Sequence, residues 1–321
     1  MLKNRILITG INGFLGSSLK NYITENHSSW QIHGIDKKGK KAKSFIKMDI
    51  ANKDKLKSLL LKIRPRYIFH FSGSVSNKNF PNLLQSNVFD TFALLNTIKS
   101  IKDYDPRILI PSSAAEYGNV SLQEMPIEEK HNLNPVTLYG FSKMLQTKLS
   151  LLFANQGTNI VIARIFNISG QGIPEDFSLG KFSRELVLIK KNKKRPVLHT
   201  KSLRTKRDFL DIHDVCKHLV AICIHGKKGE IYNVCRGKSF KIGYLLESLL
   251  KISGIKGIKI VTHEKHNQDD LSNSFGSRKK INKIAKINKL ISIEKSLEDT
   301  YSYYLSSIKK GGFGARKTKK R

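Results

Sequence analysis

The sequence predicts an α/β fold, with a doubly wound parallel sheet and a second, smaller C-terminal α/β domain. Two observations support this prediction. Short apolar runs alternate with amphipathic helical segments through the first half of the 321-residue chain, which is the pattern of parallel strands joined by helices. The first apolar run leads directly into a glycine-rich turn and a helix, which is how sheets of the Rossmann type begin.

The first strand and the turn after it carry a phosphate-binding pattern. Residues 6–8 are apolar and fit a buried strand, and an amphipathic helix follows over residues 14–22. Between them, Gly10 permits a tight turn, Gly13 lets the backbone approach a diphosphate, and Gly16 allows close helix packing. The helix N-terminus adds unpaired N–H groups and a positive dipole end. The turn therefore predicts a site for a dinucleotide.

A carboxylate ends the second predicted strand. Residues 31–35 form this strand, and Asp36 follows twenty residues after Gly16, placed to accept hydrogen bonds from an adenosine ribose. The charge of Asp36 would repel a 2′-phosphate, so it favours NAD(H). Lys37 and Lys38 come next and soften that preference, so NADP(H) stays an alternative.

Strands and helices continue in order along the first half of the chain. Strands are predicted at residues 45–48, 67–71, 107–110 and 159–166, and helices at residues 54–63, 82–101 and from about Pro135. Together with the first two strands, they give a Rossmann domain over residues 1–167.

The alternation loosens after Asn167, which indicates a domain boundary. A segment near 205–235 is expected to return to the first domain, while 168–204 and 236–308 form the second. Helices are predicted at 182–190, 211–224, 242–252 and 294–308, and a strand at 230–234. The last stretch, 309–321, carries seven basic residues and no acid, and is predicted to be disordered.

The bulk composition excludes several classes of protein. Lysine and arginine number 58 against 25 acids, giving a formal net charge of +33, but the lysines are spread through every segment, so we do not favour a nucleic-acid partner. No apolar run approaches the roughly 18 residues that span a bilayer, so no membrane association is expected.

The cysteines and histidines predict neither disulfides nor a metal. The three cysteines are odd in number and lack CxxC spacing, which is typical of reduced thiols in a cytoplasmic protein; they are Cys216, Cys223 and Cys235. A cluster in a polar stretch imitates metal ligands but has no second group to support it; its members are His263, His266, Asp269 and Asp270. We expect a solvated loop there.

A proton-transfer set is predicted at the end of the strand at 107–110. Tyr139 and Lys143 are four residues apart on one face of a predicted helix. Ser113 follows the strand, at the edge of the sheet where ligands of open α/β folds gather. A tyrosine becomes a useful acid or base near neutrality only beside positive charge, which Lys143 and an oxidised nicotinamide could both supply.

Several motifs in the right order make the sequence resemble the extended short-chain dehydrogenase/reductase family, which includes nucleotide-sugar epimerases, dehydratases and reductases. The resemblance covers residues 6 to about 308. The matching stretches are 9–16, Asp36, Asp49-Ile50, 112–118, 139–143, 164–167 and 207–211.

The resemblance implies roles for individual residues. The catalytic ones would be Ser113, Tyr139 and Lys143. The cofactor would contact Gly10, Asn12, Gly13, Phe14, Leu15, Gly16, Asp36, Asp49, Ile50, Tyr139 and Lys143, and the substrate would contact Asn87, Ser113, Asn167 and Arg207. The alternative for Arg207 is a structural role, in a surface ion pair with Asp208 or Asp211. The family also implies a homodimer and a role in polysaccharide biosynthesis.

One departure from the family narrows the reaction. Dehydratases of the family carry an acidic pair after the catalytic hydroxyl, because loss of water needs its own acid and base. Ala114 and Ala115 stand there instead, and Glu116 lies one residue further, so a 4,6-dehydratase is not expected.

Two reactions on nucleotide sugars stay open, together with one other class. The stretch 164–211 looks most like that of reductases acting on GDP-4-dehydro-6-deoxymannose, which implies reduction of a C4 keto group. A UDP-hexose 4-epimerase with bound NAD would use the same residues. A dinucleotide-binding sensor or an RNA-binding protein on this fold is the alternative of another class.

Overall fold

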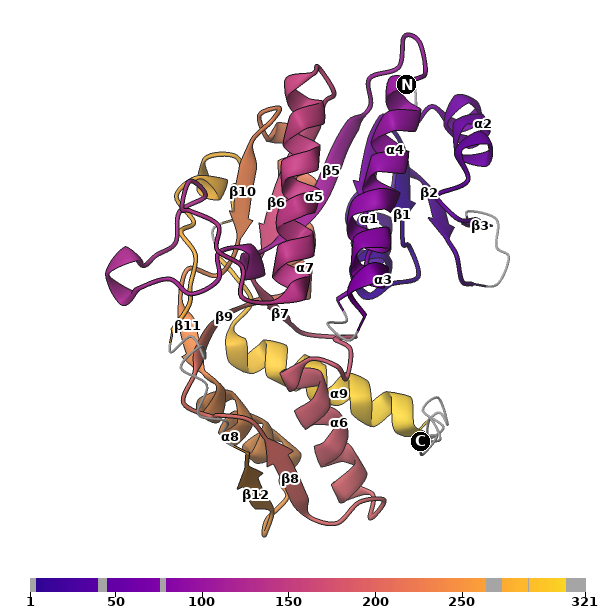
Figure 1. Ribbon diagram of the computed structural model, residues 1–321. Coiled ribbons are helices and arrows are strands. Elements are labelled where there is room, and N and C mark those ends of the chain that lie inside the picture. The colour runs from indigo at the N-terminus through magenta and orange to yellow at the C-terminus, as the bar shows by residue number, and fades with distance from the viewer. Residues whose placement is uncertain (1–3, 40–44, 76–78, 264–272, 288, 310–321) are drawn as a thin grey trace.

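A seven-stranded parallel sheet forms the centre of the larger part of the molecule (Figure 1). The computed structural model describes residues 4–39, 45–75, 79–263, 273–287 and 289–309. The strand order is β10-β6-β5-β4-β1-β2-β3, and every neighbouring pair is parallel. The strands are β1 Arg5–Thr9, β2 Gln31–Asp36, β3 Phe45–Lys47, β4 Tyr67–His70, β5 Arg107–Ser113, β6 Ile160–Ile165 and β10 Ile231–Val234. The predicted doubly wound sheet is confirmed.

The order of the strands reverses between β1 and β4. From β1 the chain proceeds outward through β2 and β3, then crosses back to β4 on the other side and continues through β5 and β6. Ligands of such sheets bind where this reversal opens a crevice at the carboxyl ends of the strands. Both the glycine turn after β1 and Ser113 at the end of β5 lie at that edge.

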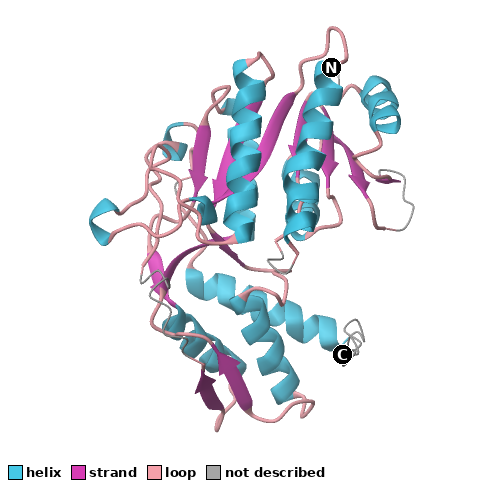
Figure 2. Ribbon diagram, viewed as in Figure 1, coloured by secondary structure: helices cyan, strands magenta, loops and turns pink. Residues whose placement is uncertain are grey.

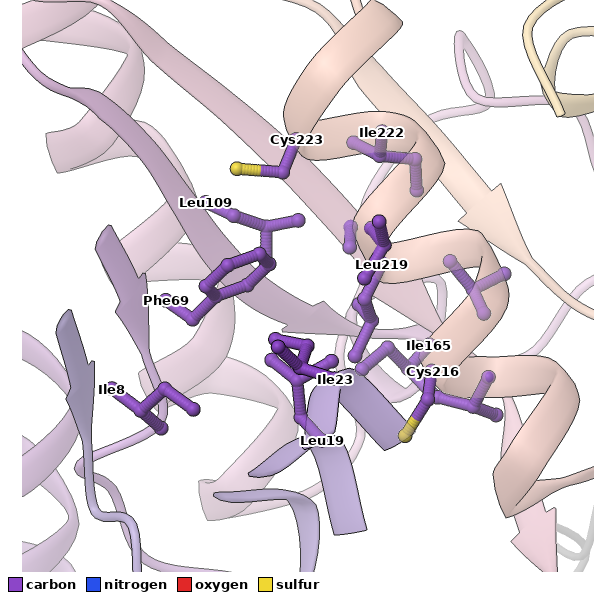
Figure 3. Packing of buried hydrophobic residues seen from close by; sticks show 14 of the residues in the cluster. Ile8, Leu19, Ile23, Phe69, Leu109, Ile165, Cys216, Leu219, Ile222 and Cys223 are labelled. Atoms are coloured by element: carbon purple, nitrogen blue, oxygen red, sulfur yellow. The ribbon is translucent and has the colours of Figure 1, made fainter. Parts of the chain in front are cut away.

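Helices cover both faces of this sheet, because alternate residues of each strand point to opposite sides. On β1, Ile6 and Ile8 join one core and Leu7 joins the other. The first core includes α1 Phe14–Asn26 and α7 Ile212–His225, and Figure 3 shows Leu219 and both cysteines of α7 among its packed side chains. The second includes α2 Lys53–Ile63, α4 Asp90–Lys99 and α5 Leu138–Asn155.

The prediction of one continuous α-helix over 82–101 is wrong in the middle of that range. The structure has α3 Phe80–Leu84, a π-helical turn at Gln85–Phe89, and then α4. A π turn admits one extra residue into the helix, and such turns are frequent at functional sites. Asn87 lies within it and is buried.

A smaller set of helices and strands packs below the sheet in the view of Figure 2. Its core joins α6 Ser178–Lys190, α8 Ile242–Ser253 and α9 Ile293–Lys309. Five short strands escaped prediction: β7 Asn167–Ser169, β9 Lys206–Asp211 and β11 Ser239–Lys241 form one sheet, and β8 Val197–Thr200 pairs with β12 Lys259–Thr262. Single 3-10 turns lie at Ala114–Glu116, Leu122–Glu124 and Ile281–Lys283.

The ends of the predicted elements mostly hold. The helix predicted over 211–224 is α7, and Asp211 caps it by accepting the N–H of His213 at 2.8 Å. Of the predicted disordered tail, Lys309 instead ends α9, and 310–321 lie outside the described residues. Within the described part of the chain, no helix combines the length and apolar character needed to cross a bilayer.

Candidate active site

The glycine turn after β1 leaves no room for a side chain at Gly10 or at Gly16. Gly10 has a φ of +64°, and a Cβ there would lie 2.6 Å from the carbonyl oxygen of Phe71. A Cβ on Gly16 would lie 2.2 Å from the carbonyl oxygen of Gly10. Gly13 begins α1 with no side chain capping the first turn, so backbone N–H groups face the turn. This cradle fits the diphosphate of a dinucleotide.

The carboxylate of Asp36 lies against this turn. One oxygen accepts the N–H of Asn12 at 3.1 Å and the other accepts the N–H of Lys38 at 3.1 Å. The Asn12 side chain in turn donates to the carbonyl of Lys38 at 2.6 Å. Phe14 and Leu15, in the first turn of α1, are half-buried and pack on the first core. Asp36 is therefore fixed at the end of β2, where the sequence predicts a ribose.

Asp49 and Ile50, two of the predicted cofactor contacts, follow β3. Ile50 is buried in the second core, whereas Asp49 is half-exposed. The Asp49 carboxylate lies 3.2 Å from the Lys37 ammonium, which also lies 3.3 Å from the buried carboxylate of Asp90. These two neighbours raise the pKa of Lys37 against a burial effect that lowers it. Lys37 is thus held between two carboxylates.

The predicted proton-transfer set gathers at the ends of β5 and α5. Thr137 starts α5 by accepting the N–H of Gly140 at 3.0 Å, which places Tyr139 and Lys143 in the first two turns. Ser113, the last residue of β5, forms a side-chain hydrogen bond with Tyr139. The buried Lys143 ammonium donates to the carbonyl of Pro111 and to the Gln146 side chain.

Burial shifts the pKa values of both titrating groups. It raises the pKa of Tyr139 to about 12, with the Ser113 hydrogen bond opposing the shift and the negative charge of Glu116 adding to it. Burial lowers the pKa of Lys143 to about 8, against the opposing effect of Glu116. Without a cofactor's charge, Tyr139 is protonated at neutral pH and can act as a proton donor.

A buried polar chain connects Lys143 to the end of β1. Gln146 donates to the Thr91 hydroxyl at 2.7 Å, and the His70 ring contacts the Thr91 and Thr9 hydroxyls at 3.0 and 2.8 Å. Burial, with a contribution from the charge of Lys143, lowers the pKa of His70 to about 3, so the ring is neutral. The chain joins the two ends of the candidate site.

Sequence reasoning missed an ion pair beneath Ser113. Glu116 and Arg164 are both buried, with an oxygen of Glu116 3.0 Å from a guanidinium nitrogen of Arg164. Arg164 also donates to the Tyr117 hydroxyl at 3.0 Å and lies over its ring. A signal was available for Arg164, because its charge interrupts an otherwise apolar stretch of sequence, and buried charges require partners.

The predicted substrate residues are placed differently from one another. Asn87 is buried, and its amide bonds the backbone of Ser74 and the hydroxyl of Ser142, so it ties the loop after β4 to α5. Asn167 on β7 is exposed and donates to the carbonyl of Asp208 at 3.1 Å. Arg207 is half-buried on the neighbouring β9, and one guanidinium nitrogen bonds the carbonyl of Lys206.

The carboxylates offered as surface partners of Arg207 have other donors. Asp208 accepts the N–H groups of Arg236 and Gly237 at 2.7 and 2.9 Å. Asp211 accepts the His213 N–H and the Ser296 hydroxyl.

In the described residues no three potential metal ligands gather. Of the predicted imitation of a metal cluster, His263 contacts His199 at 2.9 Å, while His266, Asp269 and Asp270 lie outside the described residues.

Comparison with known proteins gives a consistent group of relatives. The chain is 27% identical over 260 residues to GDP-6-deoxy-D-mannose reductase of Pseudomonas aeruginosa, covering 79% of this chain and 82% of that one. It is 25% identical over 309 residues to GDP-6-deoxy-D-talose 4-dehydrogenase of Aggregatibacter actinomycetemcomitans, covering 95% and 99%. The solved structure of RMD from Pseudomonas aeruginosa complexed with NADPH matches with a TM-score of 0.83 and 26% identity, covering 94% and 99%.

These similarities confirm the predicted fold and the prediction of an NAD(P)-dependent enzyme of the nucleotide-sugar class. Residues 6–235 match the description "NAD dependent epimerase/dehydratase family". Because this match spans more than half of the chain, the protein belongs to the NAD-dependent epimerase/dehydratase family.

Proposed function

We propose that this protein reduces the C4 keto group of a nucleotide-linked 4-keto-6-deoxyhexose, such as GDP-4-dehydro-6-deoxymannose, with NAD(P)H. The observation that carries this proposal is the junction of Ser113 and Tyr139 beside Lys143, without an acidic pair at Ala114 and Ala115. Two relatives named for chemistry on GDP-6-deoxyhexoses support the substrate class.

The residues of the chain divide the work of the reduction. The chemistry that a nicotinamide supplies when bound is a hydride for the carbonyl carbon. Tyr139 donates its proton to the oxygen that becomes negative, and the Ser113 hydroxyl hydrogen-bonds the same oxygen. Lys143, on the next turn of α5, contributes the positive charge that lowers the cost of leaving a phenolate behind.

NAD(H) is the favoured cofactor, with NADP(H) as the alternative. Asp36 is fixed by two backbone N–H groups, so its charge stays where a 2′-phosphate would lie. Lys37 is paired with Asp49 and Asp90, and the next residue, Lys38, is also basic and exposed. A related structure contains NADPH, which supports testing both cofactors.

We also assign the division of the molecule and its assembly as proposals. The Rossmann domain binds the cofactor, and the smaller part, with Asn167 and Arg207 at its edge, binds the sugar nucleotide.

A homodimer would cover the apolar side chains Phe92 of α4 and Leu152 of α5, which are 45% and 60% exposed on adjacent helices (Figure 1). The buried free thiols suit a cytoplasmic enzyme of polysaccharide biosynthesis.

Two other functions make different predictions. A UDP-hexose 4-epimerase would use the same catalytic residues and is supported by the family description. A dinucleotide-binding sensor or RNA-binding protein would bind cofactor without turnover, and the assembled Ser113, Tyr139 and Lys143 argue against it.

The test is a panel of nucleotide-linked sugars, both 4-keto-6-deoxy sugars and ordinary hexoses, incubated with NADH or NADPH. We expect stoichiometric loss of reduced-nicotinamide absorbance with a GDP-4-keto-6-deoxy sugar. Conversion of a UDP-hexose to its C4 epimer without net change in the cofactor would establish the epimerase instead. If the protein binds cofactor but turns over none of the sugars, the result would favour a dinucleotide-binding sensor over an enzyme.

A further inference from the structure

The carboxylate of Glu116 lies next to Ser113, and both of its oxygens accept hydrogen bonds. Glu116 is completely buried in the single turn that follows β5. One oxygen accepts the Ser112 hydroxyl, the Thr147 hydroxyl at 2.9 Å and the Ser113 N–H at 3.4 Å, and the other accepts Arg164 at 3.0 Å. Such a buried charge is tolerated only because four donors surround it.

These four donors come from the three elements that make the catalytic end of the site. Ser112 and Ser113 end β5, Thr147 lies one turn after Lys143 on α5, and Arg164 lies on β6 opposite Ser112. The same turn is closed by a reciprocal cap, in which the Ser113 hydroxyl accepts the N–H of Ala115 at 3.2 Å. Glu116 therefore fixes the backbone of Ser113 relative to the helix that carries Tyr139.

The charges around this carboxylate come from every neighbouring element. Arg164 on β6 is its direct partner, with Tyr117 and the backbone of Glu129 bonded to the same guanidinium. On the other side, Tyr139 and Lys143 of α5 experience the negative charge, and the neutral His70 of β4 lies in the field of Lys143. Within this set, Glu116 opposes loss of the proton from both α5 groups.

We propose that Glu116 is a positioning residue of this site: its buried carboxylate holds Ser113 and α5 in the geometry that joins Ser113 to Tyr139. From that place its negative charge also favours the protonated form of the Tyr139 phenol. The inference rests on the proposed function, because a protonated phenol is the form that donates to a newly formed alkoxide.

The test is Glu116→Gln, which keeps the shape of the side chain and removes its charge. We expect a lower kcat and an alkaline limb of the pH profile displaced by about one unit toward lower pH, since the phenol loses its proton more readily. A second readout needs no turnover. Ultraviolet titration of the phenol, taken as the difference between each protein and its Tyr139→Phe counterpart, should show the same displacement.

A matched control changes one donor and leaves the charge in place. Thr147→Val removes a hydroxyl from the same carboxylate oxygen, and Tyr139 should then titrate as in the unaltered protein. Because Glu116→Gln leaves Arg164 buried without its partner, Glu116→Gln/Arg164→Gln is the second variant, and Tyr139 should still titrate at lower pH.

The outcomes separate this proposal from the proposed function. Unchanged titration of Tyr139 in both Glu116 variants, whatever the loss of turnover, would overturn the charge role and leave Glu116 as a part of the fold. Failure of both variants to fold would do the same. A displaced titration in a protein that turns over no sugar would support the role of Glu116 and contradict the reductase.

Discussion

The two ends of the candidate site are built by different means. At the glycine turn, the fit depends on backbone atoms that leave no room for a Cβ at Gly10 or Gly16. At the catalytic end, the fit depends on buried charges and hydroxyls, centred on Glu116 and Lys143. The first end should therefore respond to added volume, whereas the second should respond to charge and to pH.

The difference reflects what each end has to do. Binding a diphosphate requires close approach of backbone N–H groups, which volume alone can spoil. Moving a proton requires groups whose pKa values are displaced in opposite directions, which burial and neighbouring charges provide for Tyr139 and Lys143. The chain from Lys143 through Thr91 and His70 to Thr9 joins the two designs.

The largest expected effect is at the catalytic end. Tyr139→Phe removes the proton donor and keeps the ring, so kcat should fall by roughly 10²- to 10⁴-fold. Cofactor affinity, measured by quenching of protein fluorescence, should stay close to that of the unaltered protein. An unchanged kcat would show that Tyr139 is not the proton donor. It would also contradict the view that the catalytic end of the site works by proton transfer.

The next effect is at the glycine turn. Gly16→Ala places a Cβ 2.2 Å from the Gly10 carbonyl oxygen, which should cost about 1–3 kcal/mol of folding stability and weaken dinucleotide binding. Gly13→Ala is the matched variant, because its Cβ would meet only the Gly10 oxygen at 3.2 Å. It should retain the thermal midpoint and lose cofactor affinity. Equal stability of the two variants would contradict the volume argument.

A smaller effect concerns the choice of cofactor. Asp36→Asn removes the charge that opposes a 2′-phosphate and keeps an acceptor for one of the two N–H groups, those of Asn12 and Lys38, that the carboxylate oxygens now accept. The ratio of dissociation constants for NADPH and NADH should move toward NADPH by about tenfold. A ratio that stays constant would show that Asp36 does not set the preference.

The smallest effect is on stability as a function of pH. The folded protein keeps His70 neutral because its pKa is lowered to about 3, while the unfolded chain takes up a proton near pH 6.5. Stability from this group is therefore complete above about pH 6.5 and falls toward lower pH by at most about 1.4 kcal/mol per unit. The thermal midpoint of the protein should drop between pH 7 and 5.

A variant isolates this contribution from that of other groups. His218, with a pKa lowered to about 4, acts in the same direction, whereas Asp208, with a pKa raised to about 6, acts in the opposite one. His70→Asn should lower stability at pH 7 and make the midpoint fall less steeply toward pH 5. Parallel pH curves for the two proteins would show that His70 does not contribute.

The parts of the fold that depend on local sequence were predictable. The glycine turn, the strand ending at Asp36 and the cap at Asp211 each carry their signal within a few residues. The π turn around Asn87 was not, because the same apolar pattern fits a continuous helix. The strands β7 and β11 are three residues long and exist only through pairing with β9, which no local pattern encodes.

The sequence predicted that Ser113, Tyr139 and Lys143 lie close together. It did not predict the buried ion pair that holds this part of the site. The spacing of Tyr139 and Lys143 placed them on one helix face, and Ser113 was expected beside them. The pairing of Glu116 with Arg164 joins residues 48 positions apart, so it depends on the register of β5 against β6. The roles assigned to the catalytic, cofactor-binding and substrate-binding residues all stay predictions.

The central claim is net hydride transfer to a sugar carbonyl with Tyr139 as the acid. The most direct measurement uses NADH in which both hydrogens at C4 of the nicotinamide are deuterium, a GDP-4-keto-6-deoxyhexose, and magnetic resonance of the product. We predict one deuterium at C4 of the sugar for each NADH consumed, and with Tyr139→Phe the same incorporation at a rate lower by the factor given above for kcat. A UDP-hexose converted to its C4 epimer, with no deuterium incorporated and no NADH consumed, would contradict the account.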